Sequence, residues 1–279
     1  MIYVIKLVLD SNCDLTLEFC QKHDIEMIPL SVAFGQKVYT ENIDMSKKEF
    51  YEMMEASEEL PKTSQPSPQQ YFDVFEKLAK EGHQMIVLTV TSALSGCYQS
   101  AMIAKQMCED AVIEIIDTKN AAIGVQIQAL EILKMIQKGE IFENILVKAK
   151  ENVEKTRLYA TIDTLKNLIK GGRVSKTEGL LGTLVDIKPM ITFNEEGRIV
   201  SCAKSRGMKM ALRKMADHIK SEKIDFSKTI VCGYTAHADN LKRLIGLMSD
   251  VRYDAEIEVG AVIGTHAGPG AAAVAYFVE

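Results

Sequence analysis

The 279-residue sequence has no tryptophan and no excess of positive charge. Its 33 Lys and Arg residues are outnumbered by 38 Asp and Glu residues, giving a formal net charge of −5. A nucleic-acid-binding surface needs clustered positive charge to displace counterions from phosphates. No basic stripe with interleaved aromatic residues is present, so we expect no nucleic-acid partner.

The sequence also has no C-x-x-C pair, although it contains six cysteines. Zinc knuckles and thioredoxin-like redox sites are therefore not supported, and we expect no metal and no cofactor. Wide cysteine spacings in a chain of this length favour free, buried thiols in a reducing cytoplasm.

No run of 18 uninterrupted apolar residues occurs, so no transmembrane helix is expected. The apolar N-terminal run is interrupted by Lys6 and ends at Asp10 without a small-residue cleavage site, which predicts a strand and not a signal peptide. We expect a cytoplasmic protein with at most transient membrane contact.

The first half of the sequence alternates β-branched apolar runs with helical patterns. Strands are predicted at 3–9, 26–34, 85–90 and 112–116. Helices are predicted after Ser67-Pro68, ending at Gly82, and at 121–138, ending at Gly139. This alternation predicts βαβ crossovers and a doubly wound, mostly parallel sheet.

The pattern changes near residue 155, where we predict a boundary between an α/β domain (1–155) and an α+β domain (156–279). The second part should contain strands at 157–162 and 229–234, a short helix up to Lys170, helices at 208–220 and 239–248, and apolar stretches at 257–263 and 271–278. Residues 187–193 and 198–203 flank Asn194-Glu-Glu-Gly197, which indicates a hairpin.

Two segments place hydroxyl residues near predicted helix starts. Thr63 and Ser64 precede the helix that opens at Pro68, and Ser95-Gly96 follow the strand at 85–90. One explanation is that these residues only cap helices and form turns. Alternatively, they bind an anion, because ligands gather beyond the carboxyl ends of parallel strands and helix N-termini favour negative charge.

The segment Gly264-Thr-His-Ala-Gly-Pro-Gly270 is rich in residues that interrupt regular structure. We therefore expect His266 on a tight loop. A lone histidine is often structural, but glycines allow close approach of the backbone to a ligand.

Two basic segments contain an arginine beside glycine, Lys170-Gly-Gly-Arg-Val-Ser-Lys176 and Lys204-Ser-Arg-Gly-Met-Lys209. Solvated loops would explain both. Alternatively, Arg173 and Arg206 face an anionic ligand or a protein that carries ATP, because arginine pairs well with phosphate.

In this order, the segments resemble the DegV family, whose characterised members include the fatty-acid-binding subunits of bacterial fatty acid kinase. The resemblance rests on Asp10-Ser, Thr63-Ser-Gln-Pro-Ser, Ser95-Gly-Cys-Tyr-Gln-Ser-Ala, Thr164-Leu with Lys170-Gly-Gly-Arg, and Gly264-x-His-x-Gly-Pro-Gly. These motifs span nearly the whole chain.

The resemblance implies two α/β domains with a fatty acid buried between them. It implies that Thr63 and Ser95 contact the lipid carboxylate beside His266, with Ser64 and Gly96 in the same site. It also associates Arg173 and Arg206 with a kinase-facing surface. The family usually has threonine after Ser-Gly, whereas this sequence has Cys97.

Two functions follow from these expectations. The first is a non-enzymatic carrier that presents a long-chain fatty acid to a separate ATP-dependent kinase; the sequence itself has no G-x-x-x-x-G-K-[ST] motif for ATP. The second is a serine hydrolase acting on acyl esters or thioesters, with Ser95 as nucleophile and His266 as base. Ser95 does not lie in a G-x-S-x-G motif, which weakens the second reading.

Overall fold

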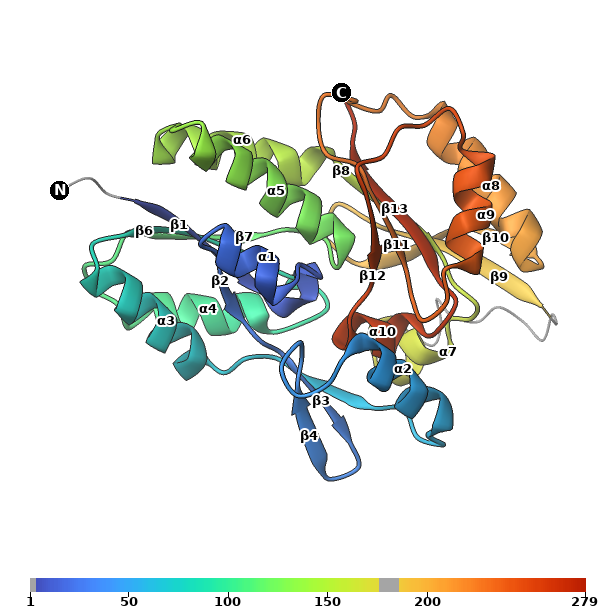
Figure 1. Ribbon diagram of the computed structural model, residues 1–279, viewed down its shortest axis with the longest axis horizontal. Helices are drawn as coiled ribbons and strands as arrows, with labels where there is room; N and C mark the ends of the chain where they lie inside the picture. The colour runs from blue at the N-terminus through green and yellow to red at the C-terminus, as the bar shows by residue number, and fades with distance from the viewer. Residues whose placement is uncertain (1–3, 176–185) are drawn as a thin grey trace.

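The protein contains two large β-sheets that lie side by side (Figure 1) in a computed structural model that describes residues 4–175 and 186–279. The first sheet has four parallel strands in the order β2-β1-β6-β7. Its strands are β1 (Ile5–Asp10), β2 (Glu26–Ile28), β6 (Gln84–Thr89) and β7 (Ile113–Asp117). All four belong to the first half of the chain, and they form the parallel sheet that the sequence predicts.

Helices cover both faces of this parallel sheet, which explains why its strands are mostly apolar. On β1, Val8 packs toward one layer of helices, whereas Leu7 and Leu9 pack toward the other. The first layer contains α3 (Pro68–Lys80) and α4 (Cys97–Gln106). The second contains η1 (Ser11–Cys13), α1 (Leu17–Lys22), α5 (Ile123–Gln137) and α6 (Phe142–Lys155).

Local signals determine where several of these helices begin and end. The Ser67 side chain accepts a hydrogen bond from the backbone N–H of Gln70, whose side chain accepts one from the Ser67 backbone, and Pro68 occupies the first helical position. The left-handed φ of +80° at Gly82 ends the segment as predicted.

The predicted single strand at 26–34 is wrong, because it divides between two sheets. Pro29 has no backbone N–H to donate, and the chain leaves the parallel sheet there. It continues into a three-stranded antiparallel sheet, which projects at the bottom of Figure 1. This sheet contains β3 (Ser31–Phe34), β4 (Lys37–Thr40) and β5 (Lys62–Ser64), and α2 (Lys47–Ala56) lies between β4 and β5 in the chain.

The second large sheet is mixed and has the order β10-β9-β8-β13-β11-β12. Its strands are β8 (Thr156–Thr161), β9 (Ile187–Phe193), β10 (Ile199–Arg206), β11 (Val231–Tyr234), β12 (Ala255–Glu258) and β13 (Ala272–Phe277). The predicted hairpin forms, with Gly197 at a φ of +74° and its N–H donating to the Asn194 carbonyl at 2.8 Å. The predicted boundary near 155 falls between α6 and β8.

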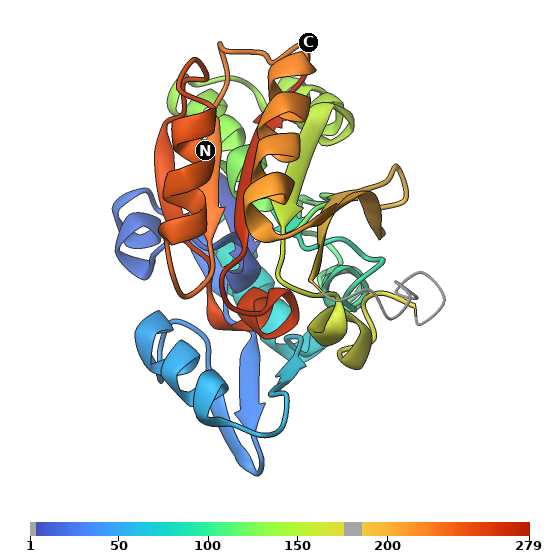
Figure 2. The same ribbon diagram turned by 90° about the vertical axis from the view of Figure 1, so that its right-hand side faces the viewer.

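Four helices accompany the mixed sheet: α7 (Lys166–Lys170), α8 (Met208–Ser221), α9 (Asp239–Leu247) and α10 (Ala261–Ala267). Figure 2 shows α8 and α9 together on the outer face of this sheet, with α10 below them. On the inner face, the sheet packs against α5.

The predicted loop around His266 is wrong, because His266 lies in the last turn of α10. A Cβ on Gly264 would lie 2.5 Å from the Tyr51 hydroxyl oxygen, so this glycine lets the helix approach α2. Tertiary packing thus outweighs the weak helix propensity of glycine. The helix ends before Gly268, whose φ is +75°.

Helix α5 is shared between the hydrophobic cores of the two large sheets. Val125 and Ile132 pack with the parallel sheet, whereas Ile123 and Ile127 pack with the mixed sheet. A helix with apolar residues on more than one side is typically buried in this way.

All six cysteines are free. The prediction that they are buried is correct for four of them and wrong for Cys202, which is exposed on β10. In the described part of the chain, no helix has the length and apolarity to cross a membrane.

Candidate functional site

A cavity of about 370 Å³ lies where the ends of the parallel strands, α10 and the inner face of the mixed sheet meet. Most of its lining is apolar. Side chains from the mixed sheet and its hairpin include Leu158, Ala160, Ile191, Phe193, Ile199 and Ala273. Side chains from the other elements include Leu30, Val90, Leu94, Ile123, Val262 and Ile263.

Polar residues also line this cavity, and four of them come from four different segments. Thr63 lies on β5, Ser95 precedes α4, Arg173 follows α7, and His266 lies on α10. Thr63 Oγ1 and His266 Nε2 are 2.9 Å apart, which is hydrogen-bond distance across 203 positions of sequence. We call these four residues the polar end of the cavity.

His266 has an environment that keeps its imidazole neutral. Burial, with a smaller contribution from the positive charge of Arg173, lowers the pKa of His266 to about 4. Its Nδ1 atom is buried without a hydrogen-bond partner among the described residues and packs on Gly171. A Cβ at Gly171 would lie 2.4 Å from that atom, so the histidine occupies space that only glycine leaves open.

Arg173 is partly buried at the cavity, where burial lowers its pKa. Its Nε donates to the Leu94 carbonyl at 3.2 Å, and its Nη1 donates to the Gly171 carbonyl at 2.5 Å. A guanidinium carries five N–H donors, so these two bonds leave others for an anion. Sequence analysis grouped Arg173 with Arg206 as facing an anionic ligand or an ATP-carrying partner, and in the structure Arg173 lies at the cavity, beside His266.

Ser95 and Cys97 are adjacent at the start of α4. Ser95 Oγ lies 3.2 Å from Cys97 Sγ and accepts the backbone N–H of Cys97 at 3.4 Å. Cys97 is fully buried, and burial raises the pKa of its thiol. The residue that departs from the family motif is therefore a protonated neighbour of Ser95, behind the cavity surface.

The remaining residues predicted for the carboxylate site occupy different positions. Ser64 lines the cavity, next to Thr63 on β5. The backbone N–H of Gly96 donates to Gln65 Oε1 at 2.7 Å, so it is already paired. A Cβ at Gly96 would lie 2.4 Å from that amide, so a larger residue would displace the Gln65 side chain.

Arg206 is separate from this group. It is an exposed residue at the end of β10 and does not belong to the cavity lining. Lys176, which ended one of the basic motifs, lies outside the described residues.

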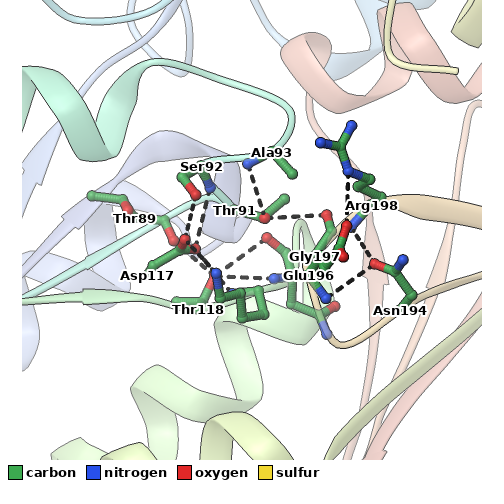
Figure 3. A network of polar contacts seen from close by, with 12 residues as sticks. Thr89, Thr91, Ser92, Ala93, Asp117, Thr118, Asn194, Glu196, Gly197 and Arg198 are labelled. Atoms are coloured by element: carbon green, nitrogen blue, oxygen red, sulfur yellow. Dashed lines mark hydrogen bonds and ion pairs between the residues drawn. The ribbon is translucent and has the colours of Figure 1, made fainter. Parts of the chain in front are cut away.

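The β9–β10 hairpin and the loop before α4 are joined by polar contacts (Figure 3). Thr91 Oγ1 donates to the Gly197 carbonyl at 3.1 Å. A Cβ on Gly197 would lie 2.1 Å from Thr91 Oγ1, so the hairpin turn packs closely on this loop. The backbone N–H of Ser92 donates to the Asp117 carboxylate at 3.2 Å, which anchors the loop to the end of β7.

The geometry does not pair Ser95 with a general base. Within residues 4–175 and 186–279, no hydrogen bond joins Ser95 to His266, whose Nε2 contacts Thr63 instead. A serine hydrolase needs its base within hydrogen-bond reach of the nucleophile. The same described residues contain no group of three His, Cys, Asp or Glu side chains arranged to hold a metal ion.

Sequence reasoning missed two residues that shape the polar end. Gln65 was part of a quoted motif but was not selected, although it lines the cavity and holds Gly96. Gly171 was interpreted as a helix end, and its contact with His266 has no local sequence signal because the two residues are far apart in the chain.

Comparisons with known proteins give a consistent result over the whole chain. Residues 4–279 match the model of a family described as "Uncharacterised protein, DegV family". A DegV domain-containing protein of Clostridium acetobutylicum is 35% identical over 277 residues, which cover 99% of this chain and 98% of that protein.

Two solved structures have the same fold. A fatty-acid-binding DegV family protein of Streptococcus agalactiae is 28% identical, with a TM-score of 0.89 and 99% of each chain covered. A stearic-acid-binding protein of Eubacterium ventriosum is 28% identical, with a TM-score of 0.85 and coverage of 99% of this chain and 98% of that one. With the family match over residues 4–279, these similarities show that the chain belongs to the DegV family.

Proposed function

We propose that this protein binds one long-chain fatty acid, with the acyl tail in the apolar cavity and the carboxylate at the polar end. The observation that carries this proposal is that a mostly apolar cavity also has Thr63, Ser95, Arg173 and His266 in its lining, with Thr63 and His266 at hydrogen-bond distance. It is supported by the related structures from S. agalactiae and E. ventriosum, which are described as fatty-acid-binding and stearic-acid-binding proteins.

The acyl tail would supply most of the binding free energy. Burial of about 15 methylene groups gains on the order of 12 kcal/mol before costs, at about 0.8 kcal/mol for each group. Lost translational, rotational and conformational freedom offsets much of this gain. The balance still favours tight retention of the lipid during purification.

The carboxylate needs hydrogen-bond donors, because an unpaired anion in an apolar cavity would take up a proton. With its pKa lowered to about 4, His266 is neutral at pH 7 and carries one ring proton. If Nε2 holds that proton and donates it to Thr63 Oγ1, the Thr63 hydroxyl hydrogen is free to donate to the carboxylate. This tautomer also leaves the buried Nδ1 as an acceptor, which avoids a buried N–H without a partner.

Arg173 and Ser95 would complete the carboxylate site. Arg173 contributes positive charge and further N–H donors beside His266. The Ser95 hydroxyl contributes a second O–H donor, since its oxygen already accepts the N–H of Cys97. In this arrangement Ser95 binds the ligand and performs no nucleophilic attack.

The finer part of the proposal is that the protein presents the bound carboxylate to a separate kinase, which transfers a phosphoryl group from ATP to form an acyl phosphate. The exposed Arg206 is available for such a partner or its phosphates. In this role the protein contributes binding and orientation, and the partner contributes the ATP site.

The proposal is tested by native mass spectrometry of freshly purified protein, followed by titration of lipid-free protein with palmitate. We expect a bound fatty acid and a weakening of palmitate affinity by about 3- to 10-fold for Thr63→Val and for Ser95→Ala, the effect of losing one hydrogen bond. Ser92→Ala is the matched control, because the Ser92 hydroxyl donates to Asp117 and Ser92 does not line the cavity.

Three outcomes would contradict these assignments. Absence of palmitate binding would refute fatty acid binding. Unchanged affinity in both hydroxyl variants would refute the carboxylate site. Turnover of p-nitrophenyl palmitate that is lost in Ser95→Ala would instead establish the hydrolase.

The kinase role has its own test, because it can fail while lipid binding holds. Palmitate-loaded protein is mixed with ATP and the ATP-binding subunit of a bacterial fatty acid kinase, and acyl phosphate is measured. We expect Arg206→Ala to retain palmitate and to slow acyl phosphate formation. Equal rates for both proteins would exclude Arg206 from the partner surface.

A further inference from the structure

Helix α10, which carries His266, is held at both ends by side chains from the first half of the chain. At its C-terminal end, His266 Nε2 contacts Thr63 Oγ1 at 2.9 Å. At its N-terminal end, the backbone N–H of Gly260 donates to Asp14 Oδ1 at 2.6 Å, and that of Val262 donates to Glu41 Oε1 at 2.8 Å.

The two acidic residues at the N-terminal end are almost fully buried, with 3% of each residue exposed. Burial raises the pKa of Asp14 to about 7 and also raises the pKa of Glu41. Buried carboxylates are costly unless hydrogen bonds compensate them. Here they satisfy helix N–H groups that have no partner within the helix and that lie at the positive end of its dipole.

Neighbouring contacts leave the start of α10 little freedom. Glu41 Oε2 accepts the Ser11 hydroxyl at 2.6 Å, and Ser11 Oγ accepts the backbone N–H of Leu30 at 3.0 Å. The Tyr51 hydroxyl donates to the Val259 carbonyl at 2.9 Å, just before the helix. The start of α10 is therefore tied, through Glu41 and Tyr51, to the ends of β1 and β2 and to α2. We call Asp14 and Glu41 the anchor of α10.

A seven-residue helix is only about 10 Å long and moves as a unit. Displacement at its first turn would therefore be transmitted to His266 in its last turn. The Thr63–His266 contact would lengthen, and the donor that Thr63 offers to a carboxylate would lose its orientation.

We infer that Asp14 and Glu41 are positioning residues for the carboxylate site, because they hold α10 so that His266 meets Thr63. This inference rests on the proposed fatty acid binding. It predicts that removing the anchor harms recognition of the carboxylate much more than recognition of the acyl tail, although neither residue belongs to the polar end.

Palmitate and hexadecan-1-ol separate these two effects, because they share a tail length and differ in the head group. We expect Glu41→Ala to weaken palmitate binding by about tenfold and hexadecan-1-ol binding by less than about threefold, because the hydrogen bond that Thr63 offers to the carboxylate would be impaired. Glu41→Gln keeps an oxygen acceptor for Val262 and should restore most of the palmitate affinity. Asp14→Ala, which removes a single anchor bond, should show the same selectivity to a smaller extent and provides a second variant if Glu41→Ala does not fold.

Glu131 provides a matched control. It lies on α5 and accepts the backbone N–H of Thr229 at 3.0 Å and its hydroxyl at 2.7 Å, so it also joins the first half of the chain to the second. Among the described residues, its hydrogen bonds and ion pair go to Thr229 and Lys134 and not to α10. Glu131→Ala should lower the melting temperature and leave the ratio of palmitate affinity to hexadecan-1-ol affinity unchanged.

A second measurement uses the lipid-free protein. The pKa of His266, followed by side-chain NMR, should be about 4 in the wild type and should rise toward 6.5 in Glu41→Ala as the imidazole becomes hydrated. An unchanged His266 titration together with an unchanged affinity ratio in Glu41→Ala would overturn the inference. If the wild-type protein binds neither ligand, the proposed function fails, and the His266 titration alone then decides whether the anchor positions the imidazole.

Discussion

The two parts of the cavity differ in how they are built. The apolar part uses side chains of β-strands and helices that also form the hydrophobic cores, such as Leu158, Ala160 and Ile123. The polar end uses single residues from four segments. Each is a partly exposed hydroxyl, guanidinium or imidazole group that is held by individual hydrogen bonds. The apolar part therefore depends on the volume that its side chains leave open, whereas the polar end depends on the positions of a few hydrogen-bonding groups.

This difference predicts that the two parts respond to different kinds of substitution. A change in volume should affect the apolar part without moving the polar groups. A change of one hydrogen bond or one close contact should affect the polar end without changing the space for a tail.

The largest effect is expected for Ala160→Phe. Ala160 lies on β8 and lines the cavity, so a phenyl ring would fill space that the tail needs. Displacing about four methylenes should weaken palmitate binding by about 100-fold, since each contributes about 0.8 kcal/mol. Isothermal titration calorimetry checks this, and NMR should still find the pKa of His266 at about 4. Full palmitate affinity in this variant would show that the tail lies elsewhere.

A smaller effect is expected for Arg173→Ala. Loss of a charge-assisted hydrogen bond to the carboxylate should weaken palmitate binding by about 10- to 100-fold and leave hexadecan-1-ol binding nearly unchanged. Arg206→Ala is the control, because that residue lies outside the cavity lining. If Arg173→Ala retains full palmitate affinity, the assignment of Arg173 to a kinase-facing surface regains support.

A still smaller effect on palmitate affinity is expected for Gly171→Ala, which tests the close contact between Gly171 and the His266 imidazole. The added Cβ would lie 2.4 Å from His266 Nδ1, so the ring must shift away. We expect palmitate to bind about 3- to 10-fold more weakly, the effect of one impaired hydrogen bond. Gly246→Ala is a suitable control, because nothing lies within 4 Å of a Cβ at that position in α9. Equal affinities for the two variants would mean that the Gly171 contact does not position His266.

The last prediction concerns protein stability instead of ligand affinity, and a carboxyl group at the end of β1. Asp10 is fully buried, and burial raises its pKa to about 7. Between about pH 4 and pH 7 the folded state thus keeps a proton that the unfolded chain has released, so this group's contribution to stability decreases as pH rises through that window.

Asp10→Asn cannot release that proton, and its stability should depend less on pH than that of the wild type. We expect the free energy of unfolding in urea to fall from pH 5 to pH 7.5 by more in the wild type than in the variant. The difference should be on the order of 1–3 kcal/mol, because each unit of pKa shift corresponds to about 1.4 kcal/mol. His266 opposes this trend, since its lowered pKa makes the folded state less stable as pH falls below 6.5; it is present in both proteins and cancels in the difference. If the unfolding free energies of the two proteins depend on pH to the same extent, Asp10 is not the group that keeps a proton in the folded state.

Local chemistry in the sequence was sufficient for much of the fold. Ser67-Pro68 marks the start of α3, and Asn194 and Gly197 mark the turn of the hairpin, because capping and turn geometry depend on near neighbours. The helical state of His266 could not be predicted in this way, since it depends on the packing of Gly264 against Tyr51, more than 200 positions earlier in the chain.

Local sequence patterns gave even less basis for predicting that the four residues of the polar end lie together. Thr63 and His266 meet only because β5 and α10 pack together, and the family resemblance was the one feature of the sequence that joined them. Arg173 is a clear case: its glycine-rich surroundings indicated an exposed loop, whereas its bonds to the Leu94 and Gly171 carbonyls turn it toward the cavity.

Helix α5 gives the molecule a property that its division into two sheets conceals. Because one side of this helix completes the core of the parallel sheet and another side completes that of the mixed sheet, neither sheet can lose its packing without exposing apolar surface of the other. The two halves should therefore melt in one cooperative transition. A fragment ending at residue 155 would leave Ile123 and Ile127 uncovered, and it should aggregate where the whole chain remains folded.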